Sequence, residues 1–366
     1  MKGNKAFQFR MYPDDEQKTM FAKTFGCVRF VYNKMLEDRI DHYQKTGKNR
    51  KTTPAKYKEE FPFLKEVDSL ALANGQMNLE TAYGNFYRGK GKIGFPKFKS
   101  KHRDKDSYTT DWVNGNIAVA DGWIRLPKVG RVKIKQHREI PDGYRLKSCT
   151  VARTPDRKYY VSVLYEYEDQ IPEHKAESAT GLDFSMKELY IDSLGNSPEY
   201  PKPYRKAQEK LAREQRKLSK CKRKSNNYYK QRVKVAKIHR KVANQRKDFL
   251  HKQSRQITNA YDAVCIEDLN MKAMSQALNF GKTVADNGWG MFVAFLGYKL
   301  EEAGKKLVKV DKWFPSSKTC SVCGRKKDDL ELSERVYVCE CGNILDRDVN
   351  AAINIRKEGM RILGMA

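Results

Sequence analysis

Residues 263–269 read AVCIEDL, an apolar strand that ends at Glu267. The same pattern occurs earlier, where GLDF at 181–184 precedes a hairpin turn and the apolar run ELYID at 188–192. Near the C-terminus, LDRDVNAA at 345–352 begins a helix with acids at its start. A carboxylate within an apolar strand is disfavoured and costly to bury without a partner. Asp183 and Glu267 therefore need a chemical explanation.

Carboxylates at the ends of three core elements are what two divalent cations require. The acids bring hard oxygen ligands, and bound metals remove the cost of burying negative charge. Two ions about 4 Å apart can activate a water and stabilise the leaving oxygen of a phosphodiester. Each acid also has a structural interpretation: a lone Asp183 suits a turn, and Asp346 suits a helix N-cap. Asp346 and Asp348 point in widely separated directions on a helix, and their spacing does not choose between them.

Four of the eight cysteines form two pairs near the C-terminus, Cys320 with Cys323 and, after fifteen residues, Cys339 with Cys341. A glycine follows each pair and lets the backbone turn tightly. Four thiolates suit tetrahedral zinc, and a set without histidine or an open position predicts a structural site. The second pair is one residue tighter than the commonest ribbon spacing. The alternative is a group of reduced surface thiols.

The chain is strongly basic, with 73 Lys and Arg against 45 Asp and Glu in 366 residues and a net charge of +28. At 39% hydrophobic residues it is too apolar for a disordered basic tail, so a folded surface must carry the charge. We find no run long enough to span a bilayer, no secretory leader and no lipidation motif. The sequence therefore predicts a cytoplasmic protein that binds nucleic acid and has no membrane partner.

The charge is concentrated between residues 201 and 255, which hold 21 Lys and Arg against three acids. Apolar spacing predicts a helical hairpin over 203–258, opened by Pro203 and interrupted at Ser225. Too few acids are present to pair with these cations, so the hairpin would repel itself unless a polyanion lay along it. The cations expected to contact nucleic-acid backbone include Arg213, Arg216, Lys220 and Arg223.

The N-terminal half alternates between helical and strand patterns. A strand is predicted over 5–12, helices over 14–43 and 68–87, and a small β-barrel from the short alternating runs of 107–168. The loop between Arg88 and Lys105 contains GFPKFKSK at 94–101, where Lys97 and Lys99 alternate with aromatics. This pattern suits phosphate contact combined with base stacking. Phe95 and Phe98 could equally anchor the loop by packing against the rest of the domain.

These pieces, in this order, resemble the TnpB family of transposon-encoded RNA-guided nucleases, relatives of the compact type V CRISPR effectors. The resemblance spans nearly the whole chain. The motifs that carry it are KAF at 5–7, FRMYP at 9–13, TFGCVRFVYN at 24–33, NLETAY at 78–83, GFPKFKSK at 94–101, GLD at 181–183, IEDL at 266–269, GWG at 288–290, FPSSKTC at 314–320 and DRDVNAAINI at 346–355.

The resemblance implies an α/β multidomain fold. A wedge β-barrel would comprise 1–12 and 106–172, and a helical recognition lobe 13–105. A RuvC-type nuclease domain with an RNase H-like fold would comprise 173–314 and 345–366, interrupted by a four-cysteine zinc ribbon at 315–344. The family's catalytic acids map onto Asp183, Glu267 and Asp348, which would hold two Mg²⁺. The Asp-x-Asn-Ala-Ala pattern selects Asp348 over Asp346.

The resemblance also implies the partners. A guide RNA from the end of the transposable element would pair with one strand of a double-stranded DNA target, beside a short motif read as duplex. The stretch 66–83 would lie near that duplex. Its exposed positions, Ser69, Ala73 and Asn74, are short, so the sequence does not predict which motif is read. Whether one copy or two binds the RNA stays open.

The predicted function is RNA-guided DNA cleavage by two-metal phosphodiester hydrolysis, with sequence choice made by base pairing. The alternative is a guide-directed repressor that binds DNA without cutting it. Loss of one of the three acids would mark such a repressor, and all three are present. A DNA-strand transferase is not supported, because no nucleophilic Tyr or Ser is found with a His-rich metal site around it.

Overall fold

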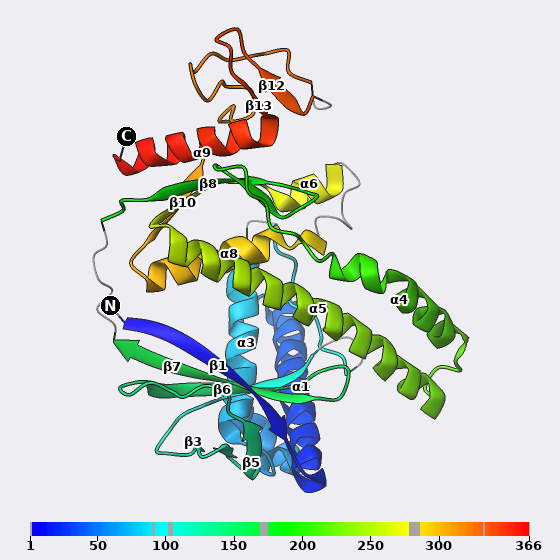
Figure 1. Cartoon of the computed structure of the whole chain (residues 1–366). Coiled ribbons are helices and arrows are strands. Elements are labelled where there is room, and N and C mark those ends of the chain that lie inside the picture. Colours follow the sequence, from blue (N-terminus) through cyan, green and yellow to red (C-terminus); the bar gives the residue numbers. More distant parts are fainter. Residues whose placement is uncertain are drawn as a thin grey trace. The chain divides into compact units, whose positions relative to one another are not determined.

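The computed structural model describes residues 2–89, 92–101, 105–168, 175–277, 286–331 and 334–365 (Figure 1). The chain divides into two compact units, Met1–Asp169 and Gln170–Ala366. The predicted boundary between residues 172 and 173 lies outside the described residues. Among the helices of the described ranges, none is long and apolar enough to cross a membrane.

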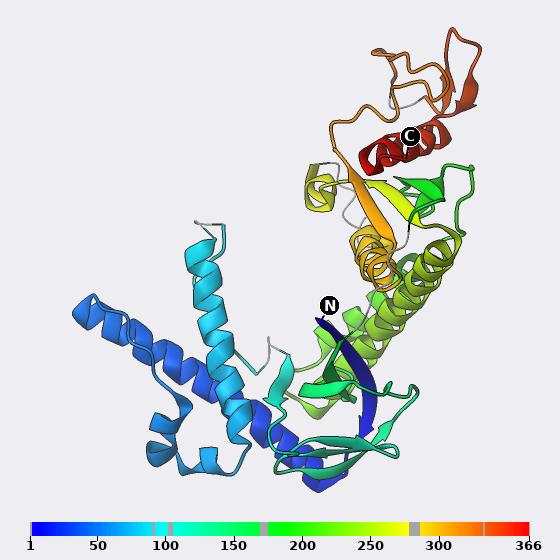
Figure 2. The ribbon, with the colours of Figure 1, turned by 90° about the vertical axis from the view of Figure 1, so that its left-hand side faces the viewer.

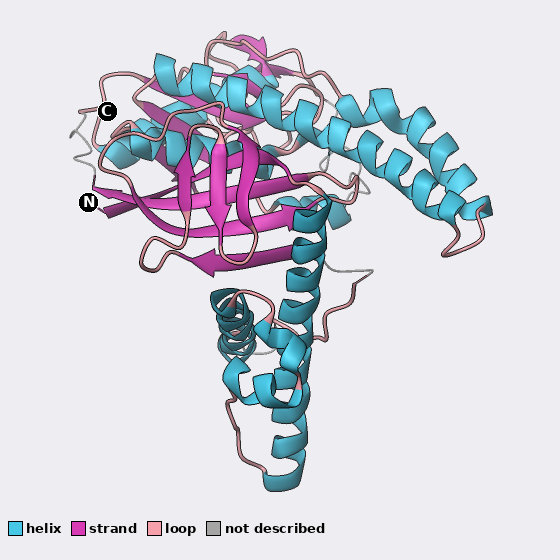
Figure 3. Ribbon diagram, turned by 90° about the horizontal axis from the view of Figure 1, so that it is seen from below, coloured by secondary structure: helices cyan, strands magenta, loops and turns pink. Residues whose placement is uncertain are grey.

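The first unit is built on a seven-stranded antiparallel sheet of order β2-β6-β7-β1-β5-β4-β3. Its strands are β1 Lys2–Tyr12, β2 Asp106–Asp111, β3 Ala118–Ala120, β4 Trp123–Leu126, β5 Gly130–Lys135, β6 Arg145–Arg153 and β7 Tyr159–Glu168. The burial of β7 alternates residue by residue, which is the pattern of a sheet with one face on the core. The long strand β1 pairs with both β7 and β5, and the sheet curls around it (Figure 3).

The predicted β-barrel corresponds to a curled sheet in this unit. Among the described residues the two edge strands, β2 and β3, do not pair with each other, so the sheet is curled and open. The short edge strand β3 spans three residues. The other edge is held by the helical part of the unit: Thr110 of β2 hydrogen-bonds to Asp68, and the Asn74 amide donates to Asp111 Oδ2 at 2.9 Å.

The helices of this unit are α1 Asp15–Thr46, α2 Tyr57–Glu60 and α3 Ser69–Arg88, with 3-10 turns at Pro54–Lys56 and Pro62–Lys65. Both long helices confirm the predicted stretches. The first starts with a capping box between Asp14 and Gln17, and Gly47 ends it in the left-handed region at φ 65°. The second starts at Asp68, whose carboxylate accepts from Leu70 N. Their apolar faces join the sheet in one core.

The second unit contains a four-stranded sheet of order β11-β10-β8-β9. Its strands are β8 Ala179–Phe184, β9 Tyr190–Asp192, β10 Ala263–Glu267 and β11 Lys306–Val310. The strands β8, β10 and β11 are parallel, and β9 returns antiparallel to β8. Successive side chains of a strand point to opposite faces of the sheet. Accordingly, Leu182, Val264 and Ile266 belong to one core cluster, and Cys265 belongs to the cluster on the other face.

Helices cover both faces of this sheet (Figure 1 and Figure 2). The first cluster includes residues of α5 Asn226–Ala260 and α8 Trp289–Glu302, and the second includes Ile355 of α9 Arg347–Leu363. Two further helices of the second unit are α4 Pro203–Lys220 and α6 Met271–Ala277. The face of the sheet that carries Cys265 therefore packs against α9.

Two glycines allow α9 to approach the sheet closely. A Cβ on Gly181 of β8 would lie 2.0 Å from the Ala352 carbonyl oxygen of α9. A Cβ on Gly359 of α9 would lie 2.1 Å from Cys265 Sγ of β10. Real Cβ atoms do not approach other atoms this closely, so the contact requires glycine at both positions.

Candidate metal centre and nucleic-acid interface

The structure brings the three predicted acids together on the α9 side of the sheet. Leu182 pairs with Ile266 in the parallel ladder, and Asp183 and Glu267 follow that pair on neighbouring strands. Alternation turns both acids to the face opposite Leu182 and Ile266, which is the face that α9 covers. Asp348 lies in the first turn of α9.

The choice between Asp346 and Asp348 has a structural basis. Asp346 is the N-cap of α9, and its carboxylate accepts from the backbone N–H groups of Asp348 and Val349 at 2.9 and 3.1 Å. This is the capping role that the sequence allowed for it. Asp346 is exposed, whereas Asp348 is half-buried and close enough to Asp183 to affect its charge.

The electrostatics of the group favour a cation. Burial, followed by the negative charges of Glu267 and Asp348, raises the pKa of Asp183 well above its ordinary value. The Arg347 guanidinium and the Phe184 backbone N–H act in the opposite direction. Carboxylates that repel each other in a partly buried site are stabilised by divalent cations, and their oxygen atoms are the ligands that Mg²⁺ prefers. The donor set therefore fits Mg²⁺.

Two further residues act on these acids without having been predicted to do so. Burial raises the pKa of Glu267, and the Ser316 hydroxyl, which donates to its carboxylate, lowers it. Arg347 lies 3.4 Å from the Asp348 carboxylate and is itself largely buried. Ser316 belongs to the FPSSKTC motif, and Arg347 stands between the two acids at 346 and 348. These positions in the sequence could have drawn attention to Ser316 and Arg347. Only the fold shows which acid each of the two side chains contacts.

The four predicted cysteines converge at a second centre. All four sulfur atoms lie within 4.8 Å of one another, with Cys320 Sγ 3.7 Å from Cys341 Sγ and Cys323 Sγ 3.6 Å from Cys339 Sγ. A tetrahedron with metal–sulfur bonds of about 2.3 Å has sulfur–sulfur edges of about 3.8 Å, so the geometry fits zinc. Among the described residues no other group of His, Cys, Asp or Glu reaches this spacing, so the three carboxylates stand further apart than the thiolates.

Local geometry prepares the cysteine cluster for a metal. Gly324 and Gly342, which follow the two pairs, have φ of 76° and 90°, so each turn needs the left-handed region. Burial raises the pKa of Cys320, but the backbone N–H groups of Cys323 and Val322 and the Asn343 amide outweigh it and lower the pKa to about 6. A thiolate is the form that binds zinc.

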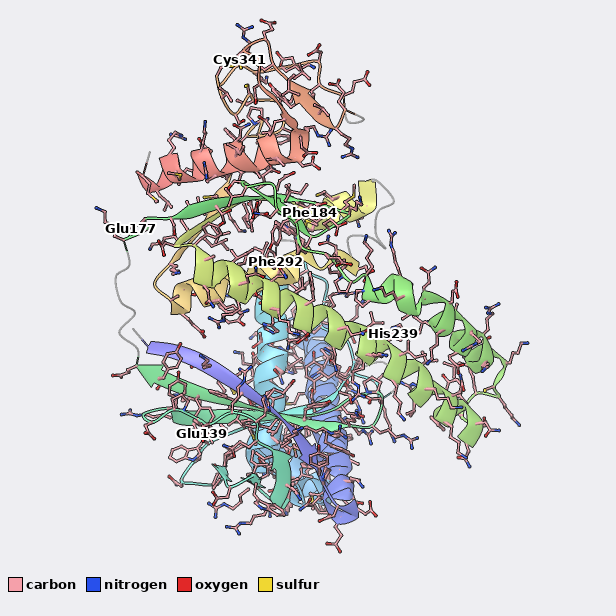
Figure 4. The ribbon with its side chains drawn as sticks, viewed as in Figure 1. Glu139, Glu177, Phe184, His239, Phe292 and Cys341 are labelled. Carbon is pink, nitrogen blue, oxygen red and sulfur yellow. The ribbon has the colours of Figure 1, made fainter. Side chains whose placement is uncertain are left out.

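The cysteine cluster is tied to the helix that carries Asp348. The Asn350 amide donates to Thr319 O at 2.7 Å, and its oxygen accepts from Ser321 N at 2.9 Å. Asn354, one turn further along α9, donates to Ser316 O and Thr319 O at 2.8 and 2.6 Å. Two short strands, β12 Val336–Val338 and β13 Ile344–Asp346, pair beside the cluster, and Figure 4 labels Cys341 there.

The basic hairpin has the predicted helices, α4 and α5, with Pro203 in the first turn of one and Ser225 as the N-cap of the other. Two of its three acids are paired within the hairpin: Glu214 is buried and accepts from the Gln231 amide at 2.7 Å and from Lys217 Nζ at 3.0 Å, and Asp248 pairs with Lys252 at 2.8 Å. The four predicted contact residues, Arg213, Arg216, Lys220 and Arg223, are all exposed. Side chains along both helices, including that of His239, project outward in Figure 4.

Part of the loop at 94–101 packs against the helices of the first unit, and part of it is exposed. Phe95 packs edge-on against Tyr83 and Phe86 of α3, with ring centroids 5.5 and 5.4 Å apart. Lys99 is anchored, because its backbone exchanges hydrogen bonds with the Asn33 side chain. Its ammonium lies 4.0 Å from the centroid of the Tyr32 ring, as in a cation–π contact. Lys97 and Phe98 are exposed.

Of the three positions proposed to face duplex DNA, only Ser69 is exposed as expected. Ala73 and Asn74 are half-buried. The Asn74 amide is engaged by Asp111 Oδ2 and by Leu70 O at 2.9 and 3.1 Å, because α3 packs against strand β2 at this point. The expected exposure of Ala73 and Asn74 is therefore wrong.

Comparison with known proteins identifies the family. A protein of Streptomyces pristinaespiralis described as "Putative RNA-guided DNA endonuclease" is 35% identical over 97% of this chain and 89% of its own length. The chain belongs to the TnpB family. A second relative, InsQ of Escherichia coli K12, carries the same description and is 29% identical over 99% of this chain and 94% of its own. The TnpB-like protein L79 of Acanthamoeba polyphaga mimivirus is 28% identical over 59% of this chain and 44% of its own.

Three family models match separate parts of this TnpB-family chain. "Probable transposase" matches residues 162–278, "Cas12f1-like, TNB domain" matches 289–355 and "Helix-turn-helix domain" matches 1–48. In this structure residues 2–46 form the strand β1 and the single long helix α1 instead of a helical pair. The second model spans α8, the cysteine cluster and the start of α9.

The fold is similar to that of a solved complex. The protein chain in a cryo-EM structure of a Cas12f1–sgRNA–target DNA complex matches with a TM-score of 0.59, covering 97% of this chain and 99% of that chain at 13% sequence identity. The likeness establishes a shared mixed α/β fold for the TnpB-family chain.

Proposed function

We propose that this TnpB-family protein is an RNA-guided DNA endonuclease that cuts beside a short duplex motif. The observation that supports the proposal most directly is the convergence of Asp183, Glu267 and Asp348 on the α9 face of the sheet. In this proposal the second unit would be the RNase H-like nuclease domain, with the four-cysteine ribbon inserted in it. Relatives described as RNA-guided DNA endonucleases over nearly their full length support the same activity.

In this proposal the three acids would hold two Mg²⁺ ions, and bound Mg²⁺ would supply water activation and charge stabilisation at the scissile phosphate. The protein's own contribution is to fix the oxygen ligands. Parallel pairing of β8 and β10 sets Asp183 beside Glu267, and the glycine contacts of α9 bring Asp348 to them. Ser316 orients Glu267, and Arg347 balances charge beside Asp348.

The basic hairpin is proposed to hold guide RNA or heteroduplex backbone. Arg213, Arg216, Lys220 and Arg223 are exposed, and the hairpin's buried acid is already paired with Lys217 and Gln231. Surplus positive charge therefore faces solvent, where phosphates would neutralise it. Lys97 and Lys99 are proposed as further backbone contacts. Base pairing by the guide would supply sequence choice.

A catalytic substitution tests the proposal. Asp183→Asn removes one negative charge from the group while keeping its size, and we expect it to abolish cleavage of a guide-matched DNA target in Mg²⁺ while RNA and DNA affinity change by less than a few-fold. Asp346→Asn is the matched control, because Asp346 caps the helix two residues from Asp348 and should retain most of the activity. Full cleavage by Asp183→Asn would overturn the metal assignment. A wild-type protein that binds the target without cutting it would instead indicate a guide-directed repressor.

A further inference from the structure

The sheet of the first unit has a face that its core does not use. Ile124, Val132 and Ile134 are buried while the residues next to them in their strands are exposed, because successive side chains point to opposite faces. In β1 the buried Met11 precedes Tyr12, which is exposed. The outward side chains of β1, β5, β4 and β3 form a surface that we call the outer face. The proposed metal centres belong to the second unit and do not use it.

Strand register places two aromatic rings and a cation in one row across the outer face. Lys133 lies between Tyr12 and Trp123, which are its partners on the two neighbouring strands. Ala120 pairs with Trp123 on the other side. Directly paired residues of adjacent strands share a face, so these four side chains are neighbours. The rings of Tyr12 and Trp123 are 46% and 45% exposed, although tryptophan is highly buried on average.

A second row, two residues along the strands, adds positive charge. Arg125 of β4 pairs with Arg131 of β5, and both are exposed. The Arg125 guanidinium donates to Gly115 O at 2.6 Å, and within the described ranges neither arginine forms an ion pair with a carboxylate. Together with Lys133, the arginines surround Trp123 with positive charge, which favours an anionic ligand.

A hollow of about 420 Å³ lies beside the indole on the outer face. The two alanines of β3 explain it, because small side chains next to a large ring leave space above the sheet. Within the described part of the chain no ring or cation stacks on Trp123, so the indole is available to a ligand. The ligand needs a flat group for the indole and negative groups for the arginines. The hollow is lined by Ala118, Ala120, Asp121, Trp123, Arg125 and Arg131.

We propose that the outer face binds an unpaired stretch of RNA, with a base stacked on Trp123 and phosphates at Arg125 and Arg131. Aromatic side chains bordered by cations bind single strands without regard to sequence, because every base has a π-face. A duplex keeps its bases stacked inside the helix and would leave the indole unused. An acidic peptide would match the cations and would also leave the indole unused.

The choice of RNA rests on the proposed function. That function supplies a guide RNA as a lasting partner, whereas DNA is unpaired only after the guide has opened the target. RNA affinity is measured without cleavage, so the two proposals fail separately. A protein that does not cut DNA can still bind RNA on the outer face, and a protein that cuts DNA can hold its RNA elsewhere.

Loss of the indole tests the stacking site. The probe is a fluorescent, unstructured single-stranded RNA of about 12 nucleotides, titrated with the full chain after its own nucleic acid has been removed. We expect Trp123→Ala to weaken binding about tenfold and Trp123→Phe to retain most of the affinity, because phenylalanine still offers a ring. Trp112→Ala is the matched control, since Trp112 is 46% exposed and does not line the hollow. Unchanged binding by Trp123→Ala, or an equal loss in Trp112→Ala, would overturn the proposal.

The salt dependence of the same titration separates stacking from phosphate contact. Trp123→Ala should leave the slope of log affinity against log salt unchanged, because stacking releases no counterions. Arg131→Gln, at an exposed position that should tolerate the change, should reduce that slope by about 0.7. An unchanged slope in Arg131→Gln would contradict the phosphate position and stands as a test even if Trp123→Ala fails to fold.

Two further probes identify the strand. An RNA duplex of the same length should bind Trp123→Ala and the parent protein equally, because its bases are already stacked. A tenfold loss with the duplex would show that the indole supports the sheet instead of a base, and would refute the proposal. Single-stranded DNA of the same sequence is the last probe. A loss in Trp123→Ala that is confined to this DNA would assign the outer face to a DNA strand and overturn the choice of RNA.

Discussion

At the scale of single residues, the hydroxyl of Ser316 is expected to tune the metal centre through Glu267. Ser316→Ala removes the hydrogen bond to the Glu267 carboxylate, so that ligand loses its orienting partner. Loss of such a partner typically costs 10–100-fold in metal affinity or activity. We therefore expect about a tenfold drop in cleavage rate at limiting Mg²⁺, partly restored at high Mg²⁺, in a titration of rate against Mg²⁺. Ser317→Ala, at the neighbouring residue, should leave the titration unchanged.

Asp262 is a residue whose ionisation stabilises the second unit. Partial burial raises its pKa, but hydrogen bonds from Ser178, Glu177 and Lys305 outweigh the burial and lower the pKa from 3.8 to about 2. A carboxyl group whose pKa is lower in the folded protein than in the unfolded chain stabilises the fold. This stabilisation is complete at pH values above the unfolded-state pKa and is lost as the pH falls through the folded-state pKa. Asp262→Asn should therefore reduce the free energy of unfolding by about 2 kcal/mol at pH 7.

Urea unfolding of Asp262→Asn and the parent protein at several pH values checks this prediction. The difference should persist down to about pH 4 and shrink between pH 3.8 and 2, where the parent Asp262 becomes protonated. Asp268→Asn is the control. Its ion pair with Lys309 is more than half exposed on both sides, so its loss should cost less than about 1 kcal/mol. A constant difference across the pH range would contradict the role assigned to Asp262.

At the scale of elements, the contact between α9 and the sheet positions the acids that we propose to be catalytic. Gly181→Ala would place a methyl carbon against the Ala352 backbone, so the helix must shift away from β8. Overpacking of this kind costs about 1–3 kcal/mol, and here it also moves Asp348 relative to Asp183. We expect a lower unfolding midpoint together with a cleavage rate reduced by at least tenfold.

A matched glycine separates the steric effect from a general effect of the substitution. Gly290 lies in the first turn of α8 with nothing within 4 Å of its Cβ position. Gly290→Ala should leave cleavage unchanged and raise stability by about 0.5–1 kcal/mol through helix propensity. Equal behaviour of the two variants in thermal melting and cleavage would show that the Gly181 contact does not limit the site.

At the scale of the whole molecule, the cysteine cluster is expected to support the nuclease centre from a distance. Asn350 and Asn354 connect the backbone of residues 316–321 to α9, and Ser316 in that segment holds Glu267. A chelator that removes zinc should lower the melting temperature of the C-terminal part and reduce cleavage without abolishing it. Cys320→Ser should reproduce both effects.

Metal content measured together with thermal melting provides the test. The parent protein should contain one zinc per chain, and Cys221→Ser should retain it, because Cys221 lies on the basic hairpin away from the cluster. A full complement of zinc in Cys320→Ser, or an unchanged melting curve after chelation, would contradict a structural zinc site.

The sequence by itself predicted most of the elements and singled out the acids and cysteines that the fold brings together. Strand patterns ended at Glu267 and contained Asp183, a helix began beside Asp346, and the two cysteine pairs had the spacing of a metal site. These features are local: burial disfavours a lone carboxylate in a strand, and glycine-bounded thiolate pairs form tight turns. Local patterns can therefore be read from the sequence, and here they agree with the fold.

Only the tertiary structure decided which side chains meet. Packing of α3 against β2 leaves Asn74 half-buried where exposure is expected, and the edge strands β2 and β3 do not pair among the described residues, so the predicted barrel is a curled sheet. The contact of Ser316 with Glu267 spans 49 positions, and strand pairing puts Tyr12 and Trp123, more than a hundred positions apart, in one row. Such contacts depend on how elements pack together, which periodicity and residue spacing along the chain do not encode.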